Sequence, residues 1–354
     1  MKIRSLLISA CVAVANLRGA DFPQAEIGNG RIQAKIFLPN LKGGYYQGTR
    51  FDWSGIVYSL QFKGHDYYGP WFQAIDPAVH DFVYKGADIV AGPCSAITGP
   101  VDEFGPLGWD EAKPGGNFIK IGIGSLRKPD DAKYDNYRLY EIADPGKWSI
   151  HRDRDSIEFT QEVADSSSGY SYIYRKTLRL AKAKPEMTLE HSLKNVGARA
   201  IGTSVYNHNF LVLDNMAPGP GWFISVPFPI RTTRPPNKEL ADIRANEIVY
   251  LKKLEERDVV TTPLEGFGNS PKDNQIRIES KSAGAGMRIE GDRPLSRESL
   301  WSIRTVVAME PFIAIDIEPG REFTWKSTYT FYTLPRSADS GASTSVIAGS
   351  RSRR

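Results

Sequence analysis

The chain has 354 residues, of which 41% are hydrophobic, so it is long enough and apolar enough to bury a substantial core. Its formal net charge of +4 is unevenly placed, because residues 1–20 and 336–354 each carry +3 and leave −2 on the residues between them. A nucleic-acid-binding surface needs positive charge clustered on the folded part, so this function class is excluded. A polytopic membrane protein is excluded as well, because no internal stretch reaches the roughly 18–20 apolar residues of a span.

Residues 1–20 have the pattern of an export signal: a basic start, a short apolar run and small residues at 13–15 where a peptidase could cut. We therefore expect a periplasmic or extracellular protein that is not integral to a membrane. Cys11 follows Ile-Ser-Ala, a pattern that also fits a lipoprotein signal with Cys11 as the lipidated residue. Removal of the signal after Cys11 leaves Cys94 as the single cysteine, which excludes an intrachain disulfide.

Alternation of apolar and polar residues with period two recurs along the chain and predicts strands. The clearest examples are the segments 31–38, 170–180, 187–193, 206–212, 313–317 and 323–331. Gly- and Pro-rich turns separate such runs, as at 217–221 and 318–320. The pattern predicts an all-β protein with one large antiparallel β-sandwich domain over residues 21–335. Residues 336–354 have almost no bulky apolar side chains, and we expect a disordered tail there.

Segment 237–257 is the one helix candidate. Leu240, Ile243, Leu251 and Leu254 could share a helix face, whereas the run 248–250 (IVY) suits a strand equally well. The sequence leaves both possibilities open.

Motifs for zinc, phosphate-loop, nucleophile-elbow and dinucleotide sites are missing, so we expect neither a metal nor a cofactor. Among the five histidines, His191 falls on the apolar face of a predicted strand and is expected to be a core residue. His208 shares a face with Tyr206 and Phe210 and is flanked by two amides. An imidazole among aromatic side chains with hydrogen-bonding neighbours is a candidate for proton transfer near neutral pH.

The segment 206–210 (YNHNF) resembles the Asn-His-aromatic segment of the galactose mutarotase-like (aldose 1-epimerase) superfamily. The preceding 193–197 (LKNVG) is similar to a strand and turn of that family, and 48–53 (GTRFDW) resembles its arginine-bearing strand. The last two predicted strands, within 312–331, also resemble the end of the family's domain. The resemblance spans roughly residues 30–332.

This resemblance implies a large antiparallel β-sandwich that interconverts the anomers of an aldose by acid–base ring opening. It implies His208 as the acid that protonates the ring oxygen, Glu310 as the base, and Arg50 as a substrate contact. A carboxyl group beside Met309 and Phe312 should be partly desolvated, which would raise its pKa. Asp273 is similar to the family's substrate-binding aspartate. The amide of Asn207 is a further predicted substrate contact.

Glu103 lies in an acidic turn, 102–105, that could line the cleft or pair with Arg50. The expected partner is a free sugar or a sugar end group. The chain departs from the family because it lacks a second histidine in a Leu-His-Gly-Gly segment. Two other functions therefore stay open: a non-catalytic carbohydrate-binding sandwich, and a polysaccharide lyase or hydrolase that uses Tyr206.

Overall fold

The computed structural model describes residues 22–335, which form strands joined by turns and loops and one short 3₁₀ helix, η1 (Pro271–Asp273). The predicted export signal of residues 1–20, with Cys11, and the predicted tail at 336–354 lie outside the described residues. In the described part, no helix is long and apolar enough to cross a membrane.

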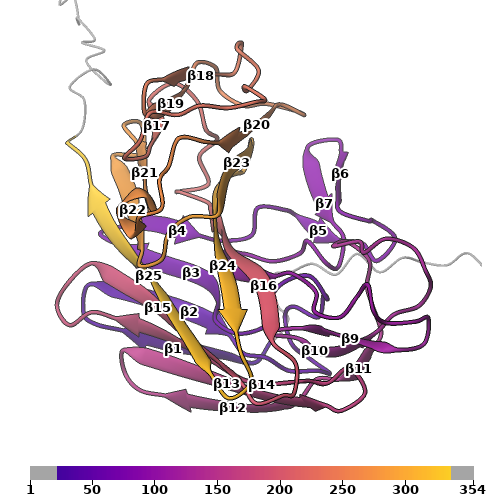
Figure 1. The fold of residues 1–354 in the computed structure, drawn as a ribbon. Helices are drawn as coiled ribbons and strands as arrows, with labels where there is room; N and C mark the ends of the chain where they lie inside the picture. The colour runs from indigo at the N-terminus through magenta and orange to yellow at the C-terminus, as the bar shows by residue number, and fades with distance from the viewer. Residues whose placement is uncertain (1–21, 336–354) are drawn as a thin grey trace, which may run out of the picture.

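Three sheets make up most of the molecule (Figure 1). The four-stranded sheet contains, in spatial order, β1 (Gln24–Gly28), β2 (Ile32–Phe37), β3 (Ile56–Phe62) and β4 (His65–Tyr68). The ten-stranded sheet contains β12 (Lys147–Arg152), β13 (Ser156–Asp165), β14 (Tyr170–Leu180), β15 (Glu186–Asn195), β25 (Glu322–Thr333), β22 (Ala285–Gly291), β21 (Gln275–Ser280), β17 (Trp222–Ser225), β19 (Glu247–Tyr250) and β18 (Ala241–Arg244). The five-stranded sheet contains β20 (Val259–Leu264), β23 (Arg297–Ile303), β24 (Val306–Ile317), β16 (Ile201–Leu211) and β8 (Gly99–Phe104).

Two smaller sheets complete the architecture. One contains β11 (Ile142–Asp144), β10 (Gly124–Arg127) and β9 (Asn117–Lys120), and the other contains β5 (Ala74–Ile75), β7 (Asp88–Ala91) and β6 (Phe82–Lys85). The hairpin of β6 and β7 projects from the body of the molecule (Figure 1). Every strand pair of the described residues is antiparallel except β5 with β7. The predicted antiparallel all-β class is therefore confirmed.

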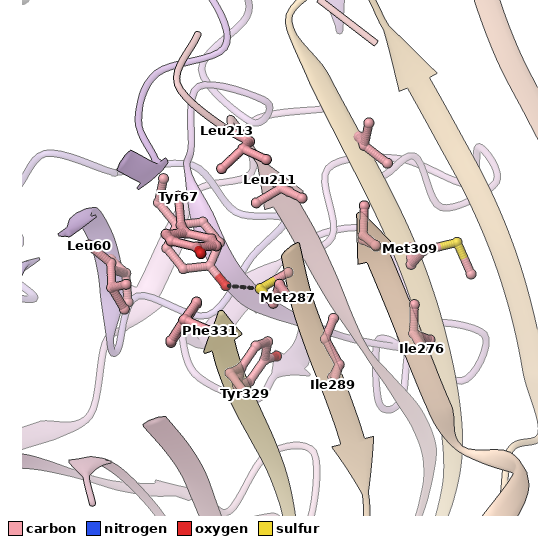
Figure 2. Close-up of a cluster of buried hydrophobic side chains, with 14 of the residues drawn as sticks. Leu60, Tyr67, Leu211, Leu213, Ile276, Met287, Ile289, Met309, Tyr329 and Phe331 are labelled. Atoms are coloured by element: carbon pink, nitrogen blue, oxygen red, sulfur yellow. Dashed lines mark hydrogen bonds between the residues drawn. The ribbon is translucent and has the colours of Figure 1, made fainter. Parts of the chain in front are cut away.

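The main core lies where the three large sheets meet. Leu60 and Tyr67 come from the four-stranded sheet, Met309 comes from the five-stranded sheet, and Met287 and Phe331 come from the ten-stranded sheet (Figure 2). These side chains are at most 1% exposed, and the rings of Tyr67 and Phe331 have centroids 4.7 Å apart. Burial of large apolar side chains from all three sheets is the main source of stability of such a fold.

Each segment predicted as a strand contains one, because alternating burial follows the alternating side chains. In β14, for example, the even-numbered residues Tyr170 to Leu180 are all buried. The open segment 237–257 forms the β18–β19 hairpin, so the strand alternative holds and the helix does not. Its turn passes through Ala245, which has a φ of 56°, a conformation that ends a regular element.

Candidate active site

Three neighbouring rows of side chains run across one face of the five-stranded sheet and form the floor of the site. The central row, set by the strand register, is Val101, His208, Glu310 and Ser299. The row on one side is Glu103, Tyr206, Phe312 and Arg297, and the row on the other is Gly99, Phe210, Ala308 and Trp301. Since residues directly opposite each other on antiparallel strands have close Cβ atoms, the register itself brings His208 and Glu310 together.

A cavity of about 340 Å³ lies above these rows, within the roughly 300–1,000 Å³ of small-molecule sites. His208, Glu310 and Arg50 line it together. The segment 71–95 also contributes to the lining through Trp71, Asp81, Phe82 and Ser95, and the loop before β11 contributes Tyr137. The half-buried Trp301 is an aromatic side chain of the kind against which a sugar ring packs, whereas Trp71 is buried and stacks on Phe210.

His208 is 5% exposed and lies among aromatic rings. Its ring stacks on Phe210, with centroids 3.8 Å apart and an interplanar angle of 5°. Burial, with a smaller contribution from the charge of Arg50, holds the pKa of His208 well below its ordinary value. Nδ1 of His208 has no hydrogen-bond partner among the described residues, so Nε2 is the ring nitrogen that is engaged.

Glu310 faces His208 directly, with Oε1 3.1 Å from Nε2 of the imidazole. Ser299, its partner on β23, donates a hydrogen bond to Oε2 at 2.6 Å. Burial raises the pKa of Glu310 despite this hydrogen bond and the nearby guanidinium of Arg50. The direction agrees with the sequence-based expectation. Phe312 shares the face of Glu310, whereas Met309 points into the core on the other side.

Arg50 is held at the edge of the cavity by two side chains of the next row. Its Nε lies 2.7 Å from Oε2 of Glu103, and its Nη2 donates to the Tyr206 hydroxyl at 3.0 Å. Tyr206 in turn donates to Glu103. Glu103 is therefore an ion-pair partner of Arg50, one of the two roles foreseen for it. It is absent from the cavity lining, so it acts through Arg50.

The structure does not bring the other two predicted substrate contacts to this cavity. Asn207 lies on the opposite face of β16, where Nδ2 donates to Asp102 at 3.1 Å and Oδ1 accepts from Tyr329 at 3.0 Å. Asp273 lies in η1 and accepts the backbone N–H of Gly268 at 2.6 Å. Asn207 is thus part of a buried network between sheets, and Asp273 stabilises a loop.

The remaining histidines and Cys94 lie outside the cavity. His191 is buried with Nε2 2.9 Å from Asp102, as expected for a core histidine. His80 is paired with Asp135 on the surface. Cys94 is buried and free. In residues 22–335, no group of three or more His, Cys, Asp or Glu side chains is arranged to hold a metal ion.

Several cavity residues were missed in the sequence. Arg297, Ser299 and Trp301 alternate along β23 and share one face, and Arg234 lies at the rim. The alternation of residues along 297–301 could have indicated that Arg297, Ser299 and Trp301 share a face. The register that sets Ser299 opposite Glu310 cannot be read from the sequence of one strand.

Comparison with known proteins shows the fold. Neither family models nor the sequences of curated proteins match this chain. An aldose epimerase homologue from C. elegans is 13% identical, with a TM-score of 0.51 over 88% of this chain and 99% of that one. A candidate aldose 1-epimerase from Klebsiella pneumoniae is 12% identical, with a TM-score of 0.51 over 85% of this chain and 76% of that one.

A protein from Synechocystis sp. PCC 6803 is 11% identical, with a TM-score of 0.51 over 89% of this chain and 97% of that one. At these identities the likeness concerns the fold alone. The chain has the galactose mutarotase-like β-sandwich fold that the sequence resemblance implied.

Proposed function

We propose that this protein is an aldose 1-epimerase-type enzyme that interconverts the anomers of an aldose. The observation that carries the proposal is the His208–Glu310 contact of 3.1 Å in a cavity of small-molecule size. The fold that it shares with the aldose epimerase homologue from C. elegans supports the same reaction class.

The reaction needs one proton donor and one acceptor at the same carbon. The C1 hydroxyl loses a proton, the bond between C1 and the ring oxygen breaks, and the ring oxygen gains a proton. Rotation about C1–C2 and reversal of these steps close the ring as the other anomer. Since both oxygens are attached to C1, two groups as close as His208 and Glu310 can reach them together.

One proton shared by the pair suffices for this cycle. Burial lowers the pKa of His208 and raises that of Glu310, so both shifts favour placing the shared proton on Glu310 rather than on the imidazole. The resemblance implies the reverse assignment, with His208 as acid and Glu310 as base. Both assignments have the same total protonation and differ by one proton movement between adjacent atoms.

Proton NMR exchange spectroscopy, which measures the rate of interconversion between anomers, tests this function with the purified protein and glucose, galactose or other aldoses. We expect faster exchange between anomers, reduced about 100-fold or more by His208→Ala or Glu310→Gln, as is usual when a general acid or base is removed. His151→Ala, which changes an exposed histidine, and Glu318→Gln, at an exposed turn, are matched controls that keep activity. A folded His208→Ala protein with full activity would contradict the proposal.

Non-catalytic sugar binding is the second candidate. It is favoured by the cavity lining, in which His208 is the one histidine among the described residues. Broadened sugar signals without faster exchange in the same experiment would support it. A lyase that uses Tyr206 as a base is disfavoured, because burial raises the pKa of that phenol well above its ordinary value and its hydroxyl is engaged by Glu103 and Arg50.

A further inference from the structure

Two arginines at the cavity have no role in the reaction described above. Arg297 lies on β23, next to Ser299 in the face that forms the floor, and Arg234 lies on the loop between β17 and β18. Both side chains are exposed, and both residues line the same cavity as His208 and Glu310. Within residues 22–335, neither guanidinium forms an ion pair, whereas Arg50 is paired with Glu103.

The structure orients the side chain of Arg297 and fixes the backbone at Arg234, and neither contact uses the N–H groups of a guanidinium. The guanidinium of Arg297 lies 3.6 Å from the centroid of the Phe312 ring, which orients it against an apolar face. The backbone carbonyl of Arg234 accepts a hydrogen bond from the Thr262 hydroxyl at 3.0 Å, which fixes its loop to β20. A guanidinium without an ion-pair partner fits a carboxylate or a phosphate, which it can bind through two parallel hydrogen bonds.

The cavity as a whole favours a negative ligand. Its two carboxyl groups, those of Asp81 and Glu310, are both shifted toward the neutral form by burial, which raises their pKa values. Asp81 also accepts a hydrogen bond from Ser95 at 2.6 Å. Arg234 and Arg297 are the arginines of this lining that form no ion pair among residues 22–335, whereas Arg50 is paired with Glu103.

The spacing suits a sugar that reaches from the acid–base pair to this charge. Arg297 stands two residues along the sheet from the row of His208 and Glu310, about 7 Å at the usual rise per residue. This is comparable to a pyranose ring with its exocyclic group, so C1 at the pair leaves the far end of the sugar near Arg297.

We propose that the substrate is an acidic aldose, with a phosphate or carboxylate group remote from C1 that Arg234 and Arg297 bind. The inference rests on the proposed function and specifies the substrate class of the same site. It assigns the two arginines to specificity, whereas His208 and Glu310 carry the proton transfers.

Anomer exchange rates test this inference on glucose, glucose 6-phosphate and glucuronate, with the native protein and with Arg234→Gln, Arg297→Gln and the double variant. We expect kcat/KM to be at least about tenfold higher for one acidic sugar than for glucose, and to fall about tenfold for each arginine removed, as for charged hydrogen bonds. The ratio of kcat/KM for the acidic sugar to kcat/KM for glucose should therefore fall in these variants, and any effect common to both sugars cancels in this ratio. Arg321→Gln, in the exposed turn between β24 and β25, is the control that keeps the acidic preference.

Three further results complete the test. Higher salt should lower kcat/KM for the acidic sugar and leave glucose unaffected, because ions screen an exposed charge pair. The preferred acidic sugar distinguishes a phosphate from a carboxylate site. Equal kcat/KM for glucose and both acidic sugars, or equal losses for all three in the arginine variants, would overturn the inference while leaving the proposed function intact.

If no sugar shows faster exchange, the proposed function fails. Saturation-transfer NMR with glucose 6-phosphate and glucuronate then tests separately whether Arg234 and Arg297 bind an acidic sugar. Binding that the double variant loses supports an anion site at Arg234 and Arg297. Absence of binding, or binding that the double variant retains, overturns it.

Discussion

Ser299 donates a hydrogen bond to Glu310 at 2.6 Å and so stabilises the ionised carboxyl group, which lowers a pKa that burial raises. The proposed reaction needs one proton on the His208–Glu310 pair, and raising the pH above the pKa of Glu310 removes it. In Ser299→Ala that pKa is higher, so we expect the falling alkaline limb of kcat/KM to move to higher pH. The pH profile of anomer exchange measures this shift.

The acid limb of the same profile should stay in place. This limb reports protonation of His208. Because the pKa of His208 is lowered, we expect the limb at a pH below 6.5, the ordinary pKa of histidine. Ser302→Ala is the matched control, because Ser302 lies on the same strand and bonds to the Val306 carbonyl. An unchanged alkaline limb in Ser299→Ala, or a shift in Ser302→Ala, would contradict this account of Glu310.

At the residue scale, the sequence indicated part of the site. His208 could be placed beside Tyr206 and Phe210, since alternate residues of a strand share a face. The same rule puts Asn207 on the opposite face, where the structure has it, so its assignment as a substrate contact conflicted with the strand prediction. Arg234 could not be assigned, because only the fold brings its loop to the cavity.

At the scale of elements, Lys176 connects two sheets. It extends from β14 of the ten-stranded sheet, with no exposed side-chain surface, and its Nζ lies 2.7 Å from Asp102 of β8 and 3.3 Å from Asp52. Removing one partner of such a group leaves buried charges without compensation. We expect Lys176→Met to lower the free energy of unfolding by roughly 3–5 kcal/mol at pH 7, measured by chemical denaturation.

The loss of unfolding free energy in Lys176→Met should depend on pH with a definite sign. Burial raises the pKa of Asp52, whereas Lys176 and His191 outweigh burial and lower the pKa of Asp102. Asp102 therefore stabilises the native protein above its ordinary pKa, and this contribution disappears as the pH falls. The deficit of Lys176→Met should shrink toward low pH as the carboxyl groups take up protons. Exposed Lys182→Met should stay within about 0.5 kcal/mol of the native protein throughout. A deficit that grows toward acid pH would refute this account.

Elements could be predicted from the sequence where burial alternates strictly, as in β15, because one buried face leaves a period of two. Segment 237–257 was ambiguous for a physical reason. Leu240 and Leu254 are buried from loops that flank the β18–β19 hairpin, so their helical spacing with Ile243 reflects no common helix face. The order of strands within the ten-stranded sheet, where β25 lies between β15 and β22, could not be predicted from local pattern at all.

At the scale of the whole molecule, the sheets share their main core. Apart from Leu213, which follows β16, the labelled side chains in Figure 2 come from the four-, five- and ten-stranded sheets, and all of them belong to one buried cluster. The Lys176 bridge and the Arg50–Glu103 pair tie the five-stranded sheet to other parts of the chain as well. No sheet can therefore lose its packing without exposing apolar surface of the others, which is the condition for cooperative unfolding.

We expect one denaturant transition for the whole protein, with coincident curves from tryptophan fluorescence and far-ultraviolet circular dichroism. Phe331→Ala, at the centre of the shared core, should move that single transition to lower denaturant and cost about 3–5 kcal/mol, as for large buried aromatic side chains. Anomer exchange per folded molecule should not change, because Phe331 does not line the cavity. Two separate transitions, of which the substitution moves one, would show instead that the sheets fold as independent units and that the single-domain prediction for residues 21–335 is wrong.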